Sequence, residues 1–165
     1  MTTLPASPRR EVDGVVGMAI FLGATTMLFA GFLLAYAVLR AQAPAWPPPG
    51  TPPFPIAAAG ANSLLLFAAT LVLRRGSPRI ALVLGAGFVL GQAALWRHLV
   101  AGHLGPGAGA LGDVFFALSV LHALHVVAGL VALLVTRKRR SRALALYWDF
   151  VLGAWVVIFV SVCLL

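Results

Sequence analysis

The stretch Val15–Leu39, VVGMAIFLGATTMLFAGFLLAYAVL, contains no charged residue over 25 consecutive positions. As a helix rising about 1.5 Å per residue it reaches about 37 Å, more than the roughly 30 Å apolar core of a bilayer. Its apolar residues are continuous rather than alternating, which argues against a strand. It is also longer than a typical signal-peptide core, and no small-x-small cleavage motif follows before Arg40. The stretch therefore predicts a transmembrane helix.

The composition of the whole chain agrees with a membrane protein. Apolar residues make up 61% of the 165 positions and charged residues only 10%, whereas a soluble domain has about a quarter of its residues charged. The high apolar content also excludes a disordered chain. The single cysteine, Cys163, excludes a disulfide framework and a multi-cysteine metal site.

Four further apolar segments follow the first, and most have the usual span length of about 17–25 residues. Since a helix satisfies its own backbone hydrogen bonds in lipid, we predict an all-α, integral membrane five-helix bundle. A tail over residues 1–13 would precede one transmembrane domain, 14–165. The predicted spans are 14–39, 56–73, 80–96, 114–136 and 144–165.

The basic residues predict the orientation of these spans, because Lys and Arg collect on the cytoplasmic side. Ten of the twelve lie at one set of span ends and only Arg40 and Arg97 at the other. The N-terminus is therefore expected inside and the C-terminus outside. The net charge of +8 then reflects topology, and we expect no nucleic-acid partner.

Polar residues inside predicted spans are candidates for function, because polar groups are costly in lipid. His122 and His125 are three positions apart and so share a helix face. One hypothesis makes them haem or metal ligands in a small membrane cytochrome. The alternative, which we favour, is hydrogen bonding across helix interfaces, and the same role is expected for Gln92 and Thr25.

A second set of residues is expected at lipid-facing or interfacial positions, as aromatic and charged side chains at span ends often are. Asp149, the only carboxylate inside a proposed span, lies near the Arg137–Arg142 cluster and is expected to form an interface ion pair rather than a proton relay. The full set comprises Arg40, Trp46, Trp96, Tyr147, Trp148 and Asp149. A transporter is less favoured, since no internal repeat is evident and the span number is odd.

Four ordered motifs carry a resemblance to a known family. They are Gly17–Leu22 continuing through Met27–Gly31 to Ala35–Arg40; Trp46–Pro49 with Asn62–Leu66; Phe115–Phe116 with His122–Gly129; and Tyr147–Val151 with Trp155. A weaker match is Gln92–Trp96. In this combination the chain resembles subunit III of the haem-copper oxidases, the cytochrome c and quinol oxidase complexes, in its five-helix form.

The resemblance implies a non-catalytic accessory subunit in the bacterial cytoplasmic membrane. It would bind no cofactor itself, pack on the haem- and copper-bearing subunit I with other respiratory subunits, hold phospholipid and support assembly and stability. The family histidines matching His122 and His125 are not redox-metal ligands.

The chain departs from the family where the family keeps intramembrane carboxylates and a histidine. The glutamates fall at Thr25 and Leu95, a further acidic residue at Leu152, and the histidine after Tyr-Trp at Asp149. These losses favour a divergent branch, for example the subunit-III-like proteins associated with nitric oxide reductases.

Overall fold

The computed structural model describes residues 8–135 and 142–164. Within them the chain forms five long helices, each long and apolar enough to cross a membrane. The helices are α1 (Pro8–Gln42), α2 (Ile56–Arg74), α3 (Pro78–Ala101), α4 (Ala110–Val135) and α5 (Arg142–Ile158), with a short π-helical turn, η1 (Phe159–Leu164), after α5. No strand occurs in the described ranges. The prediction of an all-α five-helix bundle is confirmed.

The helix ends differ from the predicted span ends in instructive ways. α1 begins at Pro8, so residues 8–13 are its first turns, while residues 1–7 lie outside the described part. α3 extends from Pro78 to Ala101, well past the predicted end at residue 96, because a helix need not stop where its apolar run stops. The cluster 137–141 and the span ends 136 and 165 lie outside the described residues.

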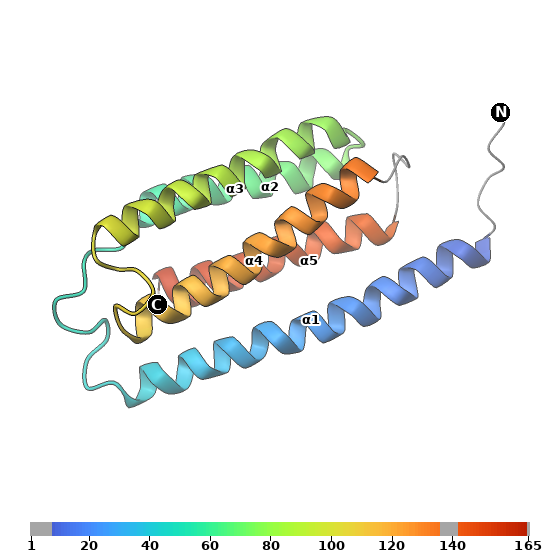
Figure 1. Cartoon of the computed structure of the whole chain (residues 1–165). Helices are drawn as coiled ribbons and strands as arrows, with labels where there is room; N and C mark the ends of the chain where they lie inside the picture. The colour runs from blue at the N-terminus through green and yellow to red at the C-terminus, as the bar shows by residue number, and fades with distance from the viewer. Residues whose placement is uncertain (1–7, 136–141, 165) are drawn as a thin grey trace.

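The helices are arranged around α5. α2 and α3 form a closely packed antiparallel pair, and α5 contacts α1, α2 and α4. α1 runs along one side of the bundle and packs on α4 and α5 (Figure 1). The turn between α2 and α3 is tight, and Gly76 adopts a φ of 86° there, a conformation that suits glycine.

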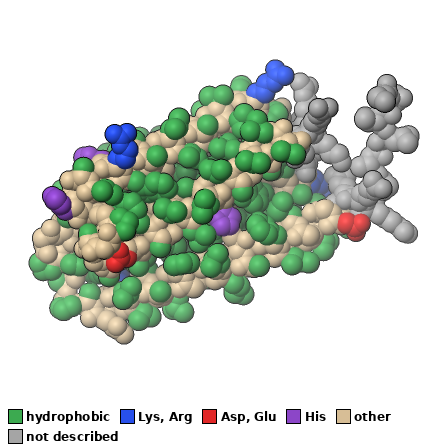
Figure 2. Space-filling model, in the orientation of Figure 1, with side chains coloured by type: hydrophobic (Ala, Val, Ile, Leu, Met, Phe, Trp, Pro, Cys, Tyr) green, Lys and Arg blue, Asp and Glu red, His purple; other side chains and the backbone are tan. Residues whose placement is uncertain are grey.

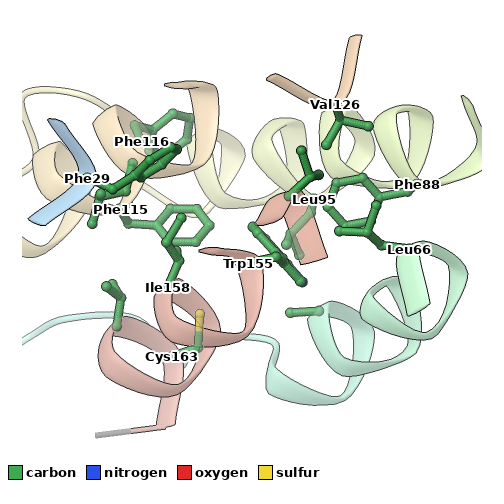
Figure 3. Packing of buried hydrophobic residues seen from close by; sticks show 14 of the residues in the cluster. Phe29, Leu66, Phe88, Leu95, Phe115, Phe116, Val126, Trp155, Ile158 and Cys163 are labelled. Carbon is green, nitrogen blue, oxygen red and sulfur yellow. The ribbon is translucent and has the colours of Figure 1, made fainter. Parts of the chain in front are cut away.

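The surface and the interior are both apolar. Figure 2 shows hydrophobic side chains along the length of the bundle, with charged side chains gathered toward its two ends. The interior is one cluster of buried residues, and its large members from α2, α3 and α5, Leu66, Phe88 and Trp155, meet near the middle (Figure 3). An apolar flank around an apolar core suits a bundle surrounded by lipid rather than water.

Candidate functional site

His122 lies at the centre of the bundle and not on its surface. Its side chain is 1% exposed. Its ring stacks on Trp155 with centroids 5.1 Å apart, and meets Phe88 edge-on at 5.9 Å. Neither ring nitrogen has a hydrogen-bond partner in the described part of the chain. Aromatic rings from α3 and α5 thus enclose this imidazole, and it serves as a packing element of the core.

His125 is held differently, although it is one turn further along α4. Its Nδ1 lies 2.8 Å from the Leu121 carbonyl oxygen. Because a carbonyl only accepts, the hydrogen of the neutral ring is on Nδ1 and Nε2 carries the lone pair. The backbone carbonyl of His125 accepts a 2.7 Å bond from Tyr147 Oη, which ties α4 to α5. The two histidines therefore sit in different surroundings.

Gln92 joins α2 to α3 through Asn62. Asn62 Nδ2 donates to the Phe88 carbonyl oxygen at 3.2 Å and to Gln92 Oε1 at 3.4 Å. The two side chains are 8% and 0% exposed. A Cβ at Gly91 would overlap Asn62, so the glycine makes this close approach of the helices feasible. Sequence reasoning predicted an interface role for Gln92 but missed its partner, Asn62.

Two serines accept hydrogen bonds from indoles across helix pairs. Trp155 Nε1 donates to Ser63 Oγ at 2.8 Å, linking α5 to α2. Trp96 Nε1 donates to Ser119 Oγ at 3.0 Å, linking α3 to α4. Trp96, expected at the membrane interface, is thus half-buried and anchored between helices. Neither serine was singled out from the sequence, because a lone serine in an apolar run gives no signal of its partner.

Thr25 makes no side-chain bond to another helix in the described ranges. Its Oγ1 donates to the Phe21 carbonyl oxygen of its own helix at 2.9 Å, as threonine commonly does in membrane helices. The side chain is nevertheless 6% exposed and so belongs to the packed face of α1.

Trp148 and Tyr147 are buried, whereas the sequence led us to expect interfacial positions for both. Trp148 is 1% exposed and Tyr147 is 6% exposed. The Trp148 ring lies against Gly85 of α3 and Gly129 of α4, and Tyr147 also lies against Gly129. Two glycines on neighbouring helices thus leave a slot for the aromatic side chains of α5. The two glycines are the sequence feature from which such a slot could have been predicted.

Asp149 forms a two-bond ion pair with Arg74, at the end of α2. Arg74 Nη2 lies 2.6 Å from Asp149 Oδ2, and Nε donates to Oδ1 at 2.8 Å. The side chains are 60% and 31% exposed. Asp149 therefore pairs across helices with an arginine that sequence reasoning did not select, while the 137–141 part of the basic cluster lies outside the described residues.

Trp46 and Arg40 lie together at the other end of the bundle. Trp46, in the proline-rich segment after α1, meets the Tyr36 ring at 5.6 Å. Arg40 is half-buried in the last turn of α1. It lines a groove of about 560 Å³ between α1 and the end of α5, together with Tyr36 and Ser161.

A second groove, of about 490 Å³, runs between α2 and α5 on the flank of the bundle. Its walls are apolar, and the Arg74–Asp149 pair lies at its edge. The lining residues are Phe67, Thr70, Leu71, Arg74, Asp149, Leu152, Gly153 and Val156. Among the described residues no group of three or more His, Cys, Asp or Glu side chains is placed to hold a metal ion. Among the described residues, the polar contacts that join helices include Asn62–Gln92, Arg74–Asp149, Trp96–Ser119, Tyr147–His125 and Trp155–Ser63.

Comparison with known proteins identifies relatives that match most of the chain. No protein-family model matches the chain. It is 31% identical over 176 residues to cytochrome c oxidase subunit 3 of Synechocystis, covering 90% of this chain and 74% of the relative. It is 33% identical to a probable cytochrome c oxidase subunit 3 of Nocardia farcinica, covering 89% and 85%. It is 28% identical to cytochrome bo(3) ubiquinol oxidase subunit 3 of Pseudomonas putida, covering 92% and 85%.

The relatives carry the name of the family that the ordered motifs resemble. The matches extend over about nine-tenths of the chain. The chain is a multi-pass membrane protein that belongs to the subunit III family of the haem-copper respiratory oxidases.

Proposed function

We propose that this chain supports a haem-copper oxidase in the bacterial cytoplasmic membrane by packing against the haem-bearing subunit I. Its role is accessory: assembly of the complex, and stability of the catalytic subunit during turnover. The observation that carries this proposal is the use of the buried polar side chains. Asn62, Gln92 and the serine–tryptophan pairs join helices, and His122 is enclosed by aromatic rings.

The orientation proposed for the subunit has the N-terminus inside and the C-terminus outside. The support is the charge distribution on the packed helices. Arg74, Arg75 and Arg79 gather where α2 ends and α3 begins, while Arg40 and Arg97 lie near the ends of α1 and α3. Basic residues favour the cytoplasmic side, which assigns the Arg74 end to the cytoplasm.

Deletion of the chain tests the accessory role directly. The complex purified from the deletion strain is expected to assemble in lower yield, or to start at a near-normal rate and inactivate after several-fold fewer turnovers. The measurement is oxygen consumption by the purified complex, followed to inactivation and normalised to haem content. Unchanged yield, initial rate and lifetime together would refute the accessory role.

Phospholipid retention is a further part of the proposal, and the α2–α5 groove supports it. Its apolar walls suit an acyl chain. At its edge the Arg74 guanidinium uses Nε and one terminal nitrogen for Asp149. Its other N–H donors have no partner within residues 8–135 and 142–164 and could bind a phosphate. The site would hold one lipid between α2 and α5.

Filling this groove should remove phospholipid from the purified complex. Gly153 lines the groove, and a Cβ there meets nothing within 4 Å, so Gly153→Leu should place its side chain in the acyl-chain space. Gly17→Leu is the matched control, because Gly17 on α1 is equally open. Mass spectrometry should find less phospholipid per complex in Gly153→Leu alone, and equal content in both variants would count against the site.

A further inference from the structure

The flank of α4 beside α1 carries a polar side chain, His125, at a depth where lipid offers no hydrogen-bond partner. His125 is the sixteenth of the 26 residues of α4, so it lies about 15 Å from the nearer helix end. The side chain is half-buried, in contact with Phe29 of α1 at a ring distance of 5.4 Å. Figure 2 shows a histidine reaching the surface in the middle of this otherwise hydrophobic face.

The open atom of His125 is Nε2. Since Nδ1 donates to Leu121, Nε2 of the neutral ring is a hydrogen-bond acceptor. No partner for it occurs in the described part of the chain, and it is not among the buried unpaired atoms such as those of His122. An accessible acceptor inside the hydrocarbon region costs free energy unless a donor reaches it.

Other accessible polar side chains of the spans do not face this problem. Thr26 donates to the Leu22 carbonyl oxygen, and Ser161 to that of Val157. Hydroxyls can thus bond their own helix, whereas the second nitrogen of an imidazole has no such partner within reach. His125 therefore differs from the ordinary polar residues of a membrane helix.

The helix stripe that contains His125 also allows close approach. Leu121, Ala128 and Ala132 follow the 3.6-residue period on the same side of α4 as His125, and Ala128 is exposed. Small side chains let another helix come near, so that an interhelical hydrogen bond can form. Lipid headgroup donors do not reach this depth, which leaves a protein side chain as the donor.

We propose that the α4 stripe Leu121–His125–Ala128–Ala132 binds a transmembrane helix of a partner subunit, which donates a hydrogen bond to His125 Nε2. The partner side chain is a hydroxyl, amide or indole donor at mid-membrane depth. This inference rests on the proposed accessory function and names the surface through which it acts. The exposed flank of α1 beside the stripe would border the same contact.

Two variants of His125 in the intact complex test the hydrogen bond. His125→Leu removes the acceptor, and His125→Gln keeps an acceptor at similar length. Co-purification of the chain with the haem-bearing subunit should fall at least tenfold in His125→Leu and stay near wild type in His125→Gln. Leu124→Ala, at a 61% exposed neighbour, controls for loss of apolar area.

Crosslinking from the native membrane locates the partner. A benzophenone amino acid at Ala128 should crosslink to a peptide of another subunit, whereas the same probe at Val83 on α3, 70% exposed, should crosslink to lipid. Lipid-only crosslinks at Ala128, or equal retention or equal loss of the leucine and glutamine variants, would overturn the inference. Failure of the wild-type chain to co-purify with any haem-copper subunit would instead overturn the proposed function.

Discussion

Trp148→Ala is expected to reduce the free energy of unfolding of the isolated chain by about 3–5 kcal/mol, the range for large aromatic-to-alanine changes in packed cores. The indole fills the slot between Gly85 and Gly129, and those glycines have no side chains that could move in to fill the cavity. Its Nε1 has no hydrogen-bond partner in the described ranges, so packing alone is lost. Unfolding of the purified chain by SDS titration in detergent micelles measures the change.

Trp148→Phe and Leu124→Ala complete the comparison. Phenylalanine keeps most of the ring volume, so Trp148→Phe should lower the free energy of unfolding markedly less than Trp148→Ala. The change from indole to phenyl breaks no hydrogen bond, because Trp148 Nε1 has no partner in the described ranges. Leu124 is 61% exposed, so its truncation should shift the free energy of unfolding by about 0.5 kcal/mol or less. A loss for Trp148→Ala no larger than for Leu124→Ala would show that the slot does not stabilise the bundle.

Gly129→Val should destabilise the bundle, with a cost of about 1–3 kcal/mol or more from overpacking. A Cβ at this position would lie 2.9 Å from Tyr147 Cε1 and 3.3 Å from Trp148 Cε2. Both contacts are ring atoms, and the tyrosine is held by its bond to the His125 carbonyl, so neither ring yields easily. The same titration of unfolding in micelles applies.

The cause of the Gly129 effect can be isolated with a second substitution. Placing Gly129→Val in a Trp148→Leu background vacates part of the slot, so the added cost of the valine should shrink, a non-additivity typical of residues in contact. Gly31→Val provides the control, since a Cβ at Gly31 meets nothing within 4 Å. Strict additivity of the double variant, or an equal loss at Gly31, would contradict the steric explanation.

The number and type of the helices could be predicted from the sequence, because each one is marked by the length of a continuous apolar run along the chain. A charge-free run such as Val15–Leu39 must be a helix in lipid whatever it packs against. The side of each helix that is buried could not be read in the same way. α4 is apolar all round, so hydrophobic periodicity does not separate the face that holds His122 from the face that meets lipid.

The hydrogen-bond and ion-pair partners of residues on different helices could not be predicted from the sequence either, because they depend on how the helices pack. Asp149 has basic residues nearby in sequence, yet its bonded partner is Arg74, 75 positions away. The partner is decided by how α2 and α5 sit against each other, which depends on the packing of Trp155 on Ser63 and Phe88. Likewise the sequence predicted an interfacial position for Trp148. The structure instead packs its ring against Gly85 and Gly129, which belong to two other helices.

The positions where the resemblance led us to expect carboxylates fall in two environments in this structure. Thr25 and Leu95 are each 6% exposed, so a carboxylate there would be buried, whereas Leu152 lines the α2–α5 groove. At the first two positions the replacement removes the cost of a buried charge. At the third position an apolar residue, Leu152, lines the α2–α5 groove. The charged residues that line this groove are Arg74 and Asp149.

The sparse packing of α1 has a consequence for how the subunit is made. Only 11% of its most apolar window is buried inside the chain, against 28–39% for the other four spans. In bilayer, burial between helices rather than hydrophobicity fixes where a helix lies, so the chain alone specifies the place of α1 less firmly than that of its neighbours. If the proposed function holds, contact with a partner subunit would bury more of α1 and fix its place, so folding of this subunit would be coupled to assembly.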